Sequence, residues 1–290
     1  MHLTIGVTGH RDLLAEEAPA LKKLVREFFL QLRNNYPGLD LQLITPLAEG
    51  CDRLVTDVAL ELGIDLIVPL PMSQEDYEKD FSSPAAIEVF RDTLKKARVI
   101  YLRSLPVESD RPVTAADRDR QYAQLGIFIS NHSQVLLALW DGKPSTATGG
   151  TASVVNYHLT AVMPGFSLAE DSPNLLADNE NDLAYHIVCS RDRLNGNPRE
   201  GLQPLQTAWI TAHFGFETGD QMPLEYEVML LRLQDYGRDN AKYEDAIEME
   251  GVDLLERAPD LELPIGTSNI AEQHRVADWL AIHFQKRISL

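Results

Sequence analysis

The sequence predicts an α/β fold: a doubly wound, mostly parallel, Rossmann-like sheet with helices on both faces, followed by a helical C-terminal region. Three observations support this prediction. Short apolar runs of strand length alternate with helical patterns over the first 190 residues. These runs are continuously apolar, which is typical of strands buried on both faces of a parallel sheet. Glycine-bearing loops follow several of the runs, as expected where strands lead into helices.

The expected strands and helices follow one another in a regular order. Strands are predicted over residues 3–7, 41–45, 65–70, 99–102, 135–140 and 184–189. Helical periodicity lies between them, over residues 15–34, 52–62, 85–96, 116–131 and 152–159. Parallel strands need crossover connections, and these are right-handed, so the helices are expected to cover both faces of the sheet.

The pattern changes after residue 194. Asn195-Gly196-Asn197-Pro198 is a strong breaker of regular structure. We therefore expect a nucleotide-binding domain over residues 1–194 and a mainly helical, acidic region over residues 195–290 that packs on it. An apolar stripe at helical spacing runs from Ile270 to Ile288 and predicts a C-terminal helix.

The composition restricts the compartment and the partners. The chain has 290 residues and a net charge of −18. It has no apolar run near the ~18 residues that span a bilayer, and its N-terminus lacks the pattern of a signal peptide. Two cysteines, Cys51 and Cys189, are too few for a disulfide framework, so we expect a reducing, cytoplasmic compartment. Nucleic-acid surfaces need clustered cations, so the negative charge predicts no nucleic-acid partner.

The first candidate loop, Thr8-Gly9-His10-Arg11-Asp12, follows the first expected strand. In an open parallel sheet, ligands bind beyond the carboxyl ends of the strands, where the winding reverses. Gly9 permits a tight turn, and Arg11 offers a planar guanidinium that suits phosphate or carboxylate. We interpret Thr8, Gly9, His10 and Arg11 as ligand-binding residues. An ordinary turn with a surface arginine is the alternative.

The second candidate loop, Ala48-Glu49-Gly50-Cys51-Asp52-Arg53, precedes a helix that is expected to begin near Asp52. A helix N-terminus presents free backbone N–H groups and the positive end of the helix dipole to an anion. Ala48, Glu49, Gly50 and Asp52 are therefore candidates, with Glu49 better placed than Asp52 to reach a ribose hydroxyl. Asp52 could instead serve only as the N-cap of the helix.

The third candidate loop runs from Trp140-Asp141-Gly142-Lys143 to Thr148-Gly149-Gly150-Thr151. Consecutive glycines that open a helix after a buried strand can cradle a phosphate. Ligand-binding candidates here are Asp141, Gly142, Lys143, Gly149, Gly150 and Thr151. A Cβ at Gly150 is expected to clash with the phosphate or to be incompatible with a positive φ. A flexible surface loop is the alternative, and no Walker A sequence is present.

Several other chemistries lack their sequence patterns. The eight histidines show no metal-ligand spacing, so we expect no metal. A Gly-x-Ser-x-Gly nucleophile elbow is absent, which disfavours a hydrolase of that type. Polar residues of the helix before the fifth strand could form a lid or simply a solvated face; they are Arg111, Arg118, Arg120, Gln121 and Tyr122.

Taken together, these segments resemble the SLOG superfamily. That superfamily groups DprA/Smf-like proteins, LOG-type nucleotide phosphoribohydrolases and the N-terminal region of TRPM channels. The resemblance covers residues 3 to about 190. It rests on three segments in order: Ile5-Gly6-Val7-Thr8-Gly9-His10-Arg11, Leu47-Ala48-Glu49-Gly50-Cys51-Asp52-Arg53 and Thr148-Gly149-Gly150-Thr151.

The resemblance implies a bacterial protein that binds or senses a nucleotide-derived ligand, such as an NAD/ADP-ribose-type molecule or a cyclic nucleotide, in signalling or defence. In enzymatic members, a glutamate on the helix after the Gly-Thr pair is catalytic, and Val154 stands at that position here. This difference favours a sensor. An N-glycosidic hydrolase acting on a nucleoside monophosphate or NAD remains open, with Glu49 and Asp141 as its candidate catalytic residues. An interaction scaffold with an empty crevice is the third possibility.

The resemblance also bears on assembly. The C-terminal helix is similar to the juxtamembrane helix of large bacterial proteins that join such a domain to membrane spans. We therefore expect that the chain could be the cytoplasmic part of a longer, membrane-anchored parent protein. A nucleotide, either NAD/ADP-ribose or a nucleoside phosphate, is the one bound group that we expect, and we expect a homo-oligomer.

Overall fold

In the computed structural model, seven strands form one sheet in the order β4-β3-β2-β1-β5-β6-β7. The first six strands are parallel to their neighbours, and β7 is antiparallel to β6. The prediction of a doubly wound, mostly parallel sheet is confirmed. The strands are β1 (His2–Gly9), β2 (Asp40–Ile44), β3 (Asp65–Leu70), β4 (Arg98–Tyr101), β5 (Val135–Trp140), β6 (Ala184–Val188) and β7 (Thr207–Ile210).

The structure describes residues 1–103, 114–145, 147–166, 182–212, 221–252 and 265–288. It divides into a unit of residues His2–Glu227, which contains the sheet, and a second unit of residues Val228–Leu290 together with Met1. Arg111, one of the residues considered for a lid, lies outside the described residues.

The winding of the sheet reverses between β1 and β5. From β1 the chain proceeds outward through β2, β3 and β4, and it then returns to place β5 on the other side of β1. Ile5 pairs with Val135 and Gly9 pairs with Leu139, so the two strands end at the same level. A crevice at this reversal is where ligands bind in open α/β sheets.

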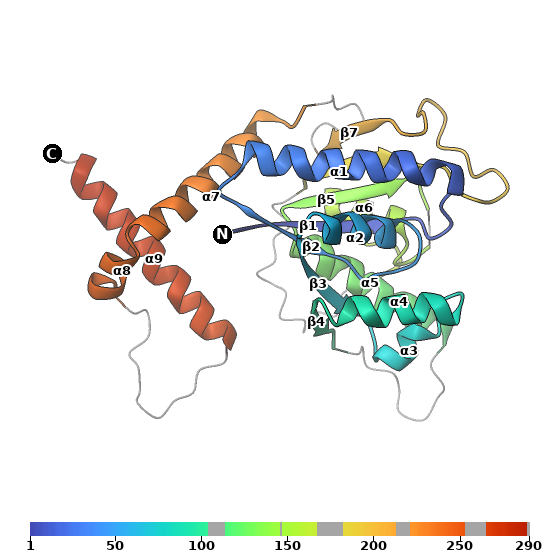
Figure 1. Ribbon diagram of the computed structural model, residues 1–290, viewed down its shortest axis with the longest axis horizontal. Coiled ribbons are helices and arrows are strands. Elements are labelled where there is room, and N and C mark those ends of the chain that lie inside the picture. Colours follow the sequence, from blue (N-terminus) through green and yellow to red (C-terminus); the bar gives the residue numbers. More distant parts are fainter. Residues whose placement is uncertain (104–113, 146, 167–181, 213–220, 253–264, 289–290) are drawn as a thin grey trace. The chain divides into compact units, whose positions relative to one another are not determined.

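Helices cover both faces of the sheet, with α1, α2 and α4 on one face and α5 and α6 on the other (Figure 1). The helices of this unit are η1 (Ala15–Glu17), α1 (Ala18–Asn35), α2 (Cys51–Glu61), α3 (Gln74–Glu78), α4 (Pro84–Leu94), α5 (Ala115–Asn131) and α6 (Thr151–Thr160). Helix α3 was not expected, because five residues are too few to show helical periodicity.

Large side chains fill the core on each face. On the α1 face, the Phe28 ring stacks on Tyr185 with the ring centroids 4.6 Å apart, and it also contacts Trp209 of β7. On the other face, α5 and α6 approach closely, because a Cβ added to Gly126 would lie 2.5 Å from Val154 Cγ2. Full burial of a large apolar side chain stabilises a fold by about 1.5–3 kcal/mol, so both helix layers are firmly held.

The sheet unit extends beyond the expected boundary at residue 194. After the turn at 195–198, Val188 N–H donates to Gln206 O and Leu205 N–H donates to Val188 O. These bonds return the chain to the sheet as β7, which packs Trp209 into the core. The unit that contains the sheet therefore continues to Glu227.

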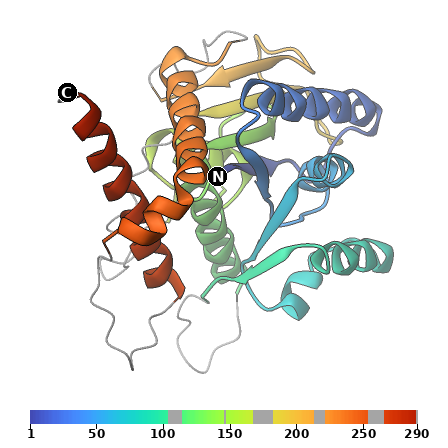
Figure 2. The same ribbon diagram turned by 60° about the vertical axis from the view of Figure 1, so that its left-hand side comes forward.

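The second unit is helical. It contains most of α7 (Leu224–Lys242), with α8 (Glu244–Glu250) and α9 (Ile265–Ile288). Ile247 of α8 is buried with Val276 and Leu280 of α9, which holds α8 against α9 (Figure 2). No helix in the described part of the chain is long and apolar enough to cross a membrane.

Candidate functional site

A cavity of about 540 Å³ lies at the reversal of the sheet. It is lined by the loops that follow β1, β5 and β6, by Asp52 of α2, by one side of α5 and by the first residues of α6. Small-molecule sites in proteins occupy ~300–1,000 Å³, so the cavity has the size of a ligand site.

Most of the residues expected to bind a ligand line this cavity. They are Thr8, Gly9, His10, Arg11, Ala48, Asp52, Asp141, Lys143, Gly149, Gly150 and Thr151. Glu49, Gly50 and Gly142 are not among its lining residues. The three candidate loops, which are far apart in the sequence, therefore meet at one place.

Two glycines bring α2 against the loop that follows β1. A Cβ at Gly9 would lie 2.3 Å from Cys51 Cβ, and a Cβ at Gly50 would lie 2.4 Å from Arg11 O. Gly50 has a φ of +85° and is the N-cap residue of α2. Asp52 is consequently not the N-cap, which was the alternative considered for it. Its side chain lies in the first turn of α2 and lines the cavity.

Asp52 is a buried carboxyl group in the cavity wall. The residue is 5% exposed, and its Oδ1 has no hydrogen-bond partner among the described residues. Burial raises the pKa of Asp52 to about 8, although the nearby Arg11 guanidinium acts in the opposite direction. An ionised carboxylate without partners is costly in such a place, so Asp52 is a neutral carboxylic acid at pH 7.

Asp141, which follows β5, has the opposite character. Its Oδ1 lies 3.2 Å from His10 Nε2 and accepts a 3.0 Å hydrogen bond from Lys143 N–H. Burial alone raises the pKa of Asp141, but the contacts with His10 and Lys143 N–H and the charge of Arg191 together lower it below its ordinary value. Asp141 is therefore an ionised carboxylate. Its second oxygen, Oδ2, is buried with no partner in the described ranges.

His10 has two possible roles beside Asp141. Its Nε2 lies 3.2 Å from both the backbone nitrogen and Oδ1 of Asp141. The backbone N–H can donate only to an unprotonated Nε2, whereas the carboxylate requires a protonated one. His10 Nε2 can therefore satisfy only one of these two contacts at a time.

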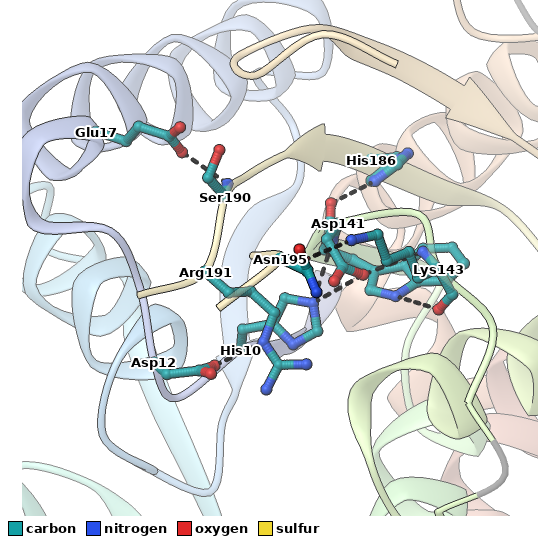
Figure 3. Close-up of polar contacts among 10 residues, drawn as sticks. His10, Asp12, Glu17, Asp141, Lys143, His186, Ser190, Arg191 and Asn195 are labelled. Carbon is teal, nitrogen blue, oxygen red and sulfur yellow. Dashed lines mark hydrogen bonds and ion pairs between the residues drawn. The ribbon is translucent and has the colours of Figure 1, made fainter. Parts of the chain in front are cut away.

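Four cationic side chains line the cavity: Arg11, Lys143, Arg191 and Arg193. The Arg11 guanidinium lies over the Tyr122 ring, 5.5 Å from its centroid. Lys143 Nζ donates to Asn195 O at 2.9 Å, and Arg191 Nε donates to Asp12 Oδ1 at 2.8 Å (Figure 3). These contacts fix where the charges lie, so the site is cationic although the chain carries a net charge of −18.

The glycine loop before α6 is built differently from what the sequence suggests. Gly150 is the N-cap of α6 with an ordinary φ of −80°, and a Cβ there would have 3.7 Å to its nearest neighbour. The expectation that Gly150 needs a positive φ is wrong. Gly149 has that conformation, with a φ of +76°, and a Cβ there would lie 2.7 Å from Ala123 N. Gly149 shapes the loop, and Gly150 leaves open space at the start of α6.

Glu49 is engaged outside the cavity. Its carboxylate accepts hydrogen bonds from Ser82 N–H at 2.8 Å and from the Ser82 hydroxyl at 2.6 Å. Glu49 therefore fixes the segment between α3 and α4. Two of the five residues considered for a lid are also tethered there, because Arg118 pairs with Asp80 at 2.6 Å and the Tyr122 hydroxyl donates to the same carboxylate.

Sequence reasoning missed part of the site. Arg191 and Arg193 belong to the loop that follows β6, and Tyr77 belongs to α3. The signal for the two arginines was present, because Ser190-Arg191-Asp192-Arg193 directly follows a predicted strand, like the other candidate loops. Tyr77 lies in a helix too short to predict, and its hydroxyl donates to Pro46 O at 3.0 Å.

The two cysteines lie beside this site. Cys51 and Cys189 are both buried as free thiols, and their side chains contact each other. Burial and the contact with Cys189 raise the pKa of Cys51 well above its ordinary value. A thiol that resists ionisation is a poor nucleophile, so the pair serves in packing. Across the described residues, no group of three or more His, Cys, Asp or Glu side chains could hold a metal ion.

Comparison with solved structures identifies two DprA proteins. One is DNA processing protein A from Streptococcus pneumoniae, with 15% identity over 47% of this chain and 41% of that chain and a TM-score of 0.32. The other is DNA processing protein A from Helicobacter pylori, with 17% identity over 48% of this chain and 54% of that chain and a TM-score of 0.30. Both are of the DprA type named in the sequence resemblance. The chain spans about half the length of each.

No family model matches the chain, and no curated protein does either.

The expectation of no nucleic-acid partner must be corrected. The Helicobacter pylori structure is described by its single-stranded DNA binding mode, which conflicts with that expectation. The physical reason is that net charge is a property of the whole chain. The cations that would meet a phosphate are local, and four of them line one cavity here.

Proposed function

We propose that the protein binds a nucleotide or nucleotide-derived ligand in the cavity between β1 and β5, and that it acts as a sensor of that ligand in a signalling or defence process. The observation that carries this proposal is the combination of four cationic side chains with the N-terminus of α6 in one cavity of ligand size. An anion placed there gains from both the charges and the helix dipole.

The phosphate of the ligand is best accommodated at the start of α6. The first N–H groups of a helix have no acceptor within the helix, and Thr151 and Ala152 of this turn line the cavity. Gly150 leaves room beside them, and Lys143 supplies a cation. Tyr122, which is partly exposed, lines the same cavity as Asp52 and offers aromatic surface for the rest of the ligand.

A thermal-shift screen tests the proposal. The panel contains AMP, ADP-ribose, NAD and cyclic AMP. Binding at a hundredfold excess over Kd stabilises a protein by about 2.7 kcal/mol, which corresponds to a rise in Tm of roughly 5–10 °C. A panel that leaves Tm unchanged at millimolar concentrations would overturn the proposal.

Gly150→Val locates the site. The backbone at Gly150 accepts a side chain, and a Cβ there would make only ordinary contacts with Ala147, the nearest at 3.7 Å, so the variant should fold. The valine would occupy the proposed phosphate position and should reduce affinity at least tenfold. Ala85→Val, at an exposed position of α4, adds the same kind of bulk elsewhere and should leave binding unchanged. Equal affinity of Gly150→Val and wild type would place the phosphate elsewhere.

A second candidate function is hydrolysis of an N-glycosidic bond. The observation that favours it is the pair of carboxyl groups in the cavity, since burial raises the pKa of Asp52 while hydrogen bonds and charges lower that of Asp141. Carboxyl groups whose pKa values are driven apart are the usual acid and base of such reactions. Asp52 would protonate the departing base, and Asp141 would activate water or stabilise the ribosyl cation.

Release of free base from AMP or NAD tests this second function. Turnover that is lost in both Asp52→Asn and Asp141→Asn, with Glu49→Gln unaffected, would establish the hydrolase. Absence of base release from a ligand that binds would leave the sensor as the function.

A further inference from the structure

The first turn of α2 combines three features that the proposed function does not use. Asp52 of this turn lines the cavity, its Oδ1 has no hydrogen-bond partner among the described residues, and the Arg11 guanidinium lies near its carboxyl group. A carboxylate at this position would repel the anionic ligand that Arg11 attracts. A protonated, neutral carboxyl group would not repel the ligand.

We propose that Asp52 binds the ligand as a neutral carboxylic acid, donating its proton in a hydrogen bond to an anionic oxygen of the ligand at the N-terminus of α2. The inference rests on the proposed function, because it concerns the same cavity.

The geometry supports a proton on this side chain. Asp52 Oδ1 is buried and has no hydrogen-bond partner among the residues described. Only 5% of the residue's surface is exposed. An ionised carboxylate normally gathers several donors, as Asp141 does with Lys143 N–H and His10. Asp52 Oδ1 has no such donor in the described part of the chain, and a neutral acid needs fewer donors than a carboxylate. An O–H···O⁻ hydrogen bond to a phosphate is charge-assisted and is stronger than a hydrogen bond between neutral groups.

The groups that face Asp52 do not titrate in the relevant range. Arg11 is cationic at every pH at which the protein is folded. Burial raises the pKa of Tyr77 far above neutrality, and burial and Cys189 raise that of Cys51. A phosphate monoester loses its second proton near pH 6 and is a dianion above pH 7. The other ionisable residues that line the cavity are His10 and Asp12 after β1, Tyr122 of α5, Asp141 and Lys143 after β5, and Arg191 and Arg193 after β6.

This assignment predicts how affinity depends on pH. Asp52 has a pKa of about 8, so the donor is present at neutral pH and is lost above pH 8. Binding should therefore weaken about tenfold between pH 7 and pH 9 and take up a proton at alkaline pH. If Asp52 were instead an ionised acceptor for a ligand hydroxyl, affinity would rise with pH.

Calorimetric titration from about pH 6.5 to pH 9 tests the inference, with ADP-ribose or NAD as the probe, whichever gives the larger thermal shift, because their second phosphate can reach Asp52 while the first lies at α6. At about pH 8.5, paired buffers of different ionisation enthalpy should reveal uptake of roughly three-quarters of a proton by the wild type. Asp52→Asn keeps a donor of the same shape and should bind within a few-fold of wild type at pH 7, with no pH dependence and no proton uptake.

Three further variants separate this role from others. Asp52→Leu fills the space without a donor and should weaken binding ten- to a hundredfold, the usual effect of losing a hydrogen bond to a charged group. Asp57→Asn, on a half-exposed position of α2, should retain the wild-type pH profile. Asp92→Asn, at an exposed position of α4, should retain it too.

Two results would overturn the inference and leave the proposed function intact. One is a probe whose affinity for wild type and for Asp52→Asn is equally independent of pH. The other is a wild-type affinity that rises with pH. Failure of every probe at every pH would overturn both.

Discussion

Replacing Asp52 with asparagine should stabilise the protein, and the gain should grow with pH. In the folded protein, burial holds the pKa of Asp52 at about 8, against an ordinary value of 3.8. In the unfolded chain the carboxyl is free to ionise. Between these two pKa values the folded state holds one proton that the unfolded state has released. The free energy of unfolding is therefore undiminished by Asp52 below about pH 4, and it falls as the pH rises towards 8.

The size of the effect follows from this linkage. Each pH unit within the interval lowers the free energy of unfolding by about 1.4 kcal/mol. Asparagine has the same shape and does not titrate. The difference in stability between Asp52→Asn and wild type should therefore increase by roughly 3 kcal/mol from pH 5 to pH 7, and should level off above pH 8.

Urea unfolding of both proteins at a series of pH values measures this difference without any ligand. Asp57→Asn is the matched control, because Asp57 is 41% exposed on the same helix and pairs with Lys22 near the surface. Exposed pairs contribute at most ~1 kcal/mol, so its effect should be small at every pH. A difference between Asp52→Asn and wild type that stays constant from pH 5 to pH 8 would show that Asp52 is ionised in the folded protein, and the reasoning would fail.

Three other outcomes are expected. Gly149→Ala should lower the free energy of unfolding in urea by about 1–3 kcal/mol, because the alanine would have to adopt a positive φ and its Cβ would lie 2.7 Å from Ala123 N. Gly150→Ala should change that free energy by less than ~1 kcal/mol. Equal losses in the two variants would contradict this assignment. Arg11→Gln should weaken AMP binding roughly five- to fiftyfold at low salt and less at high salt, and an unaltered salt dependence in titrations would remove Arg11 from the site. Burial lowers the pKa of His158 to about 4, against 6.5 ordinarily, so stability should be lost as pH falls below 6.5; His158→Gln should reduce that loss by about 2 kcal/mol between pH 7 and pH 5, and an acid profile identical to that of wild type would argue against it.

The strands of the sheet could be predicted because burial on both faces leaves a clear mark on the sequence. β3 and β5 have the predicted bounds, and β5 is buried at all six positions. β7 could not be predicted in this way, because it is an edge strand of four residues, of which only the last two are buried. A pattern of two buried residues does not distinguish a strand from a loop that contacts the core.

The site could be located from the sequence but not resolved into individual roles. Topology alone brings the ends of β1, β2 and β5 together, so any residue just beyond them becomes a candidate. The choice between Glu49 and Asp52 depends on the direction in which the backbone leaves Gly50, whose φ of +85° directs Asp52 to the cavity while Glu49 bonds to Ser82. Neighbouring acids are equivalent in a sequence and become distinct only through such a turn.

The exchange of roles between Gly149 and Gly150 has the same origin. Either glycine of a pair can adopt a positive φ, and the sequence does not say which one does. Packing decides, because the backbone and side chain of α5 at Tyr122 and Ala123 lie against Gly149. The consequence is practical: the substitution that tests binding and the substitution that tests folding are at adjacent positions.

The pairing of β1 with β5 determines when the cavity can exist during synthesis. His10 and Asp141, which meet in the cavity wall, are separated by 131 positions in the chain. At the usual ~5–20 residues per second, a ribosome needs on the order of ten seconds to make the intervening segment. Until then β1 has one of its two neighbours missing and its apolar edge is open. A ligand that requires both loops therefore recognises only chains whose sheet is complete through β5, and its presence would favour finished chains over those still exposed to aggregation or proteolysis.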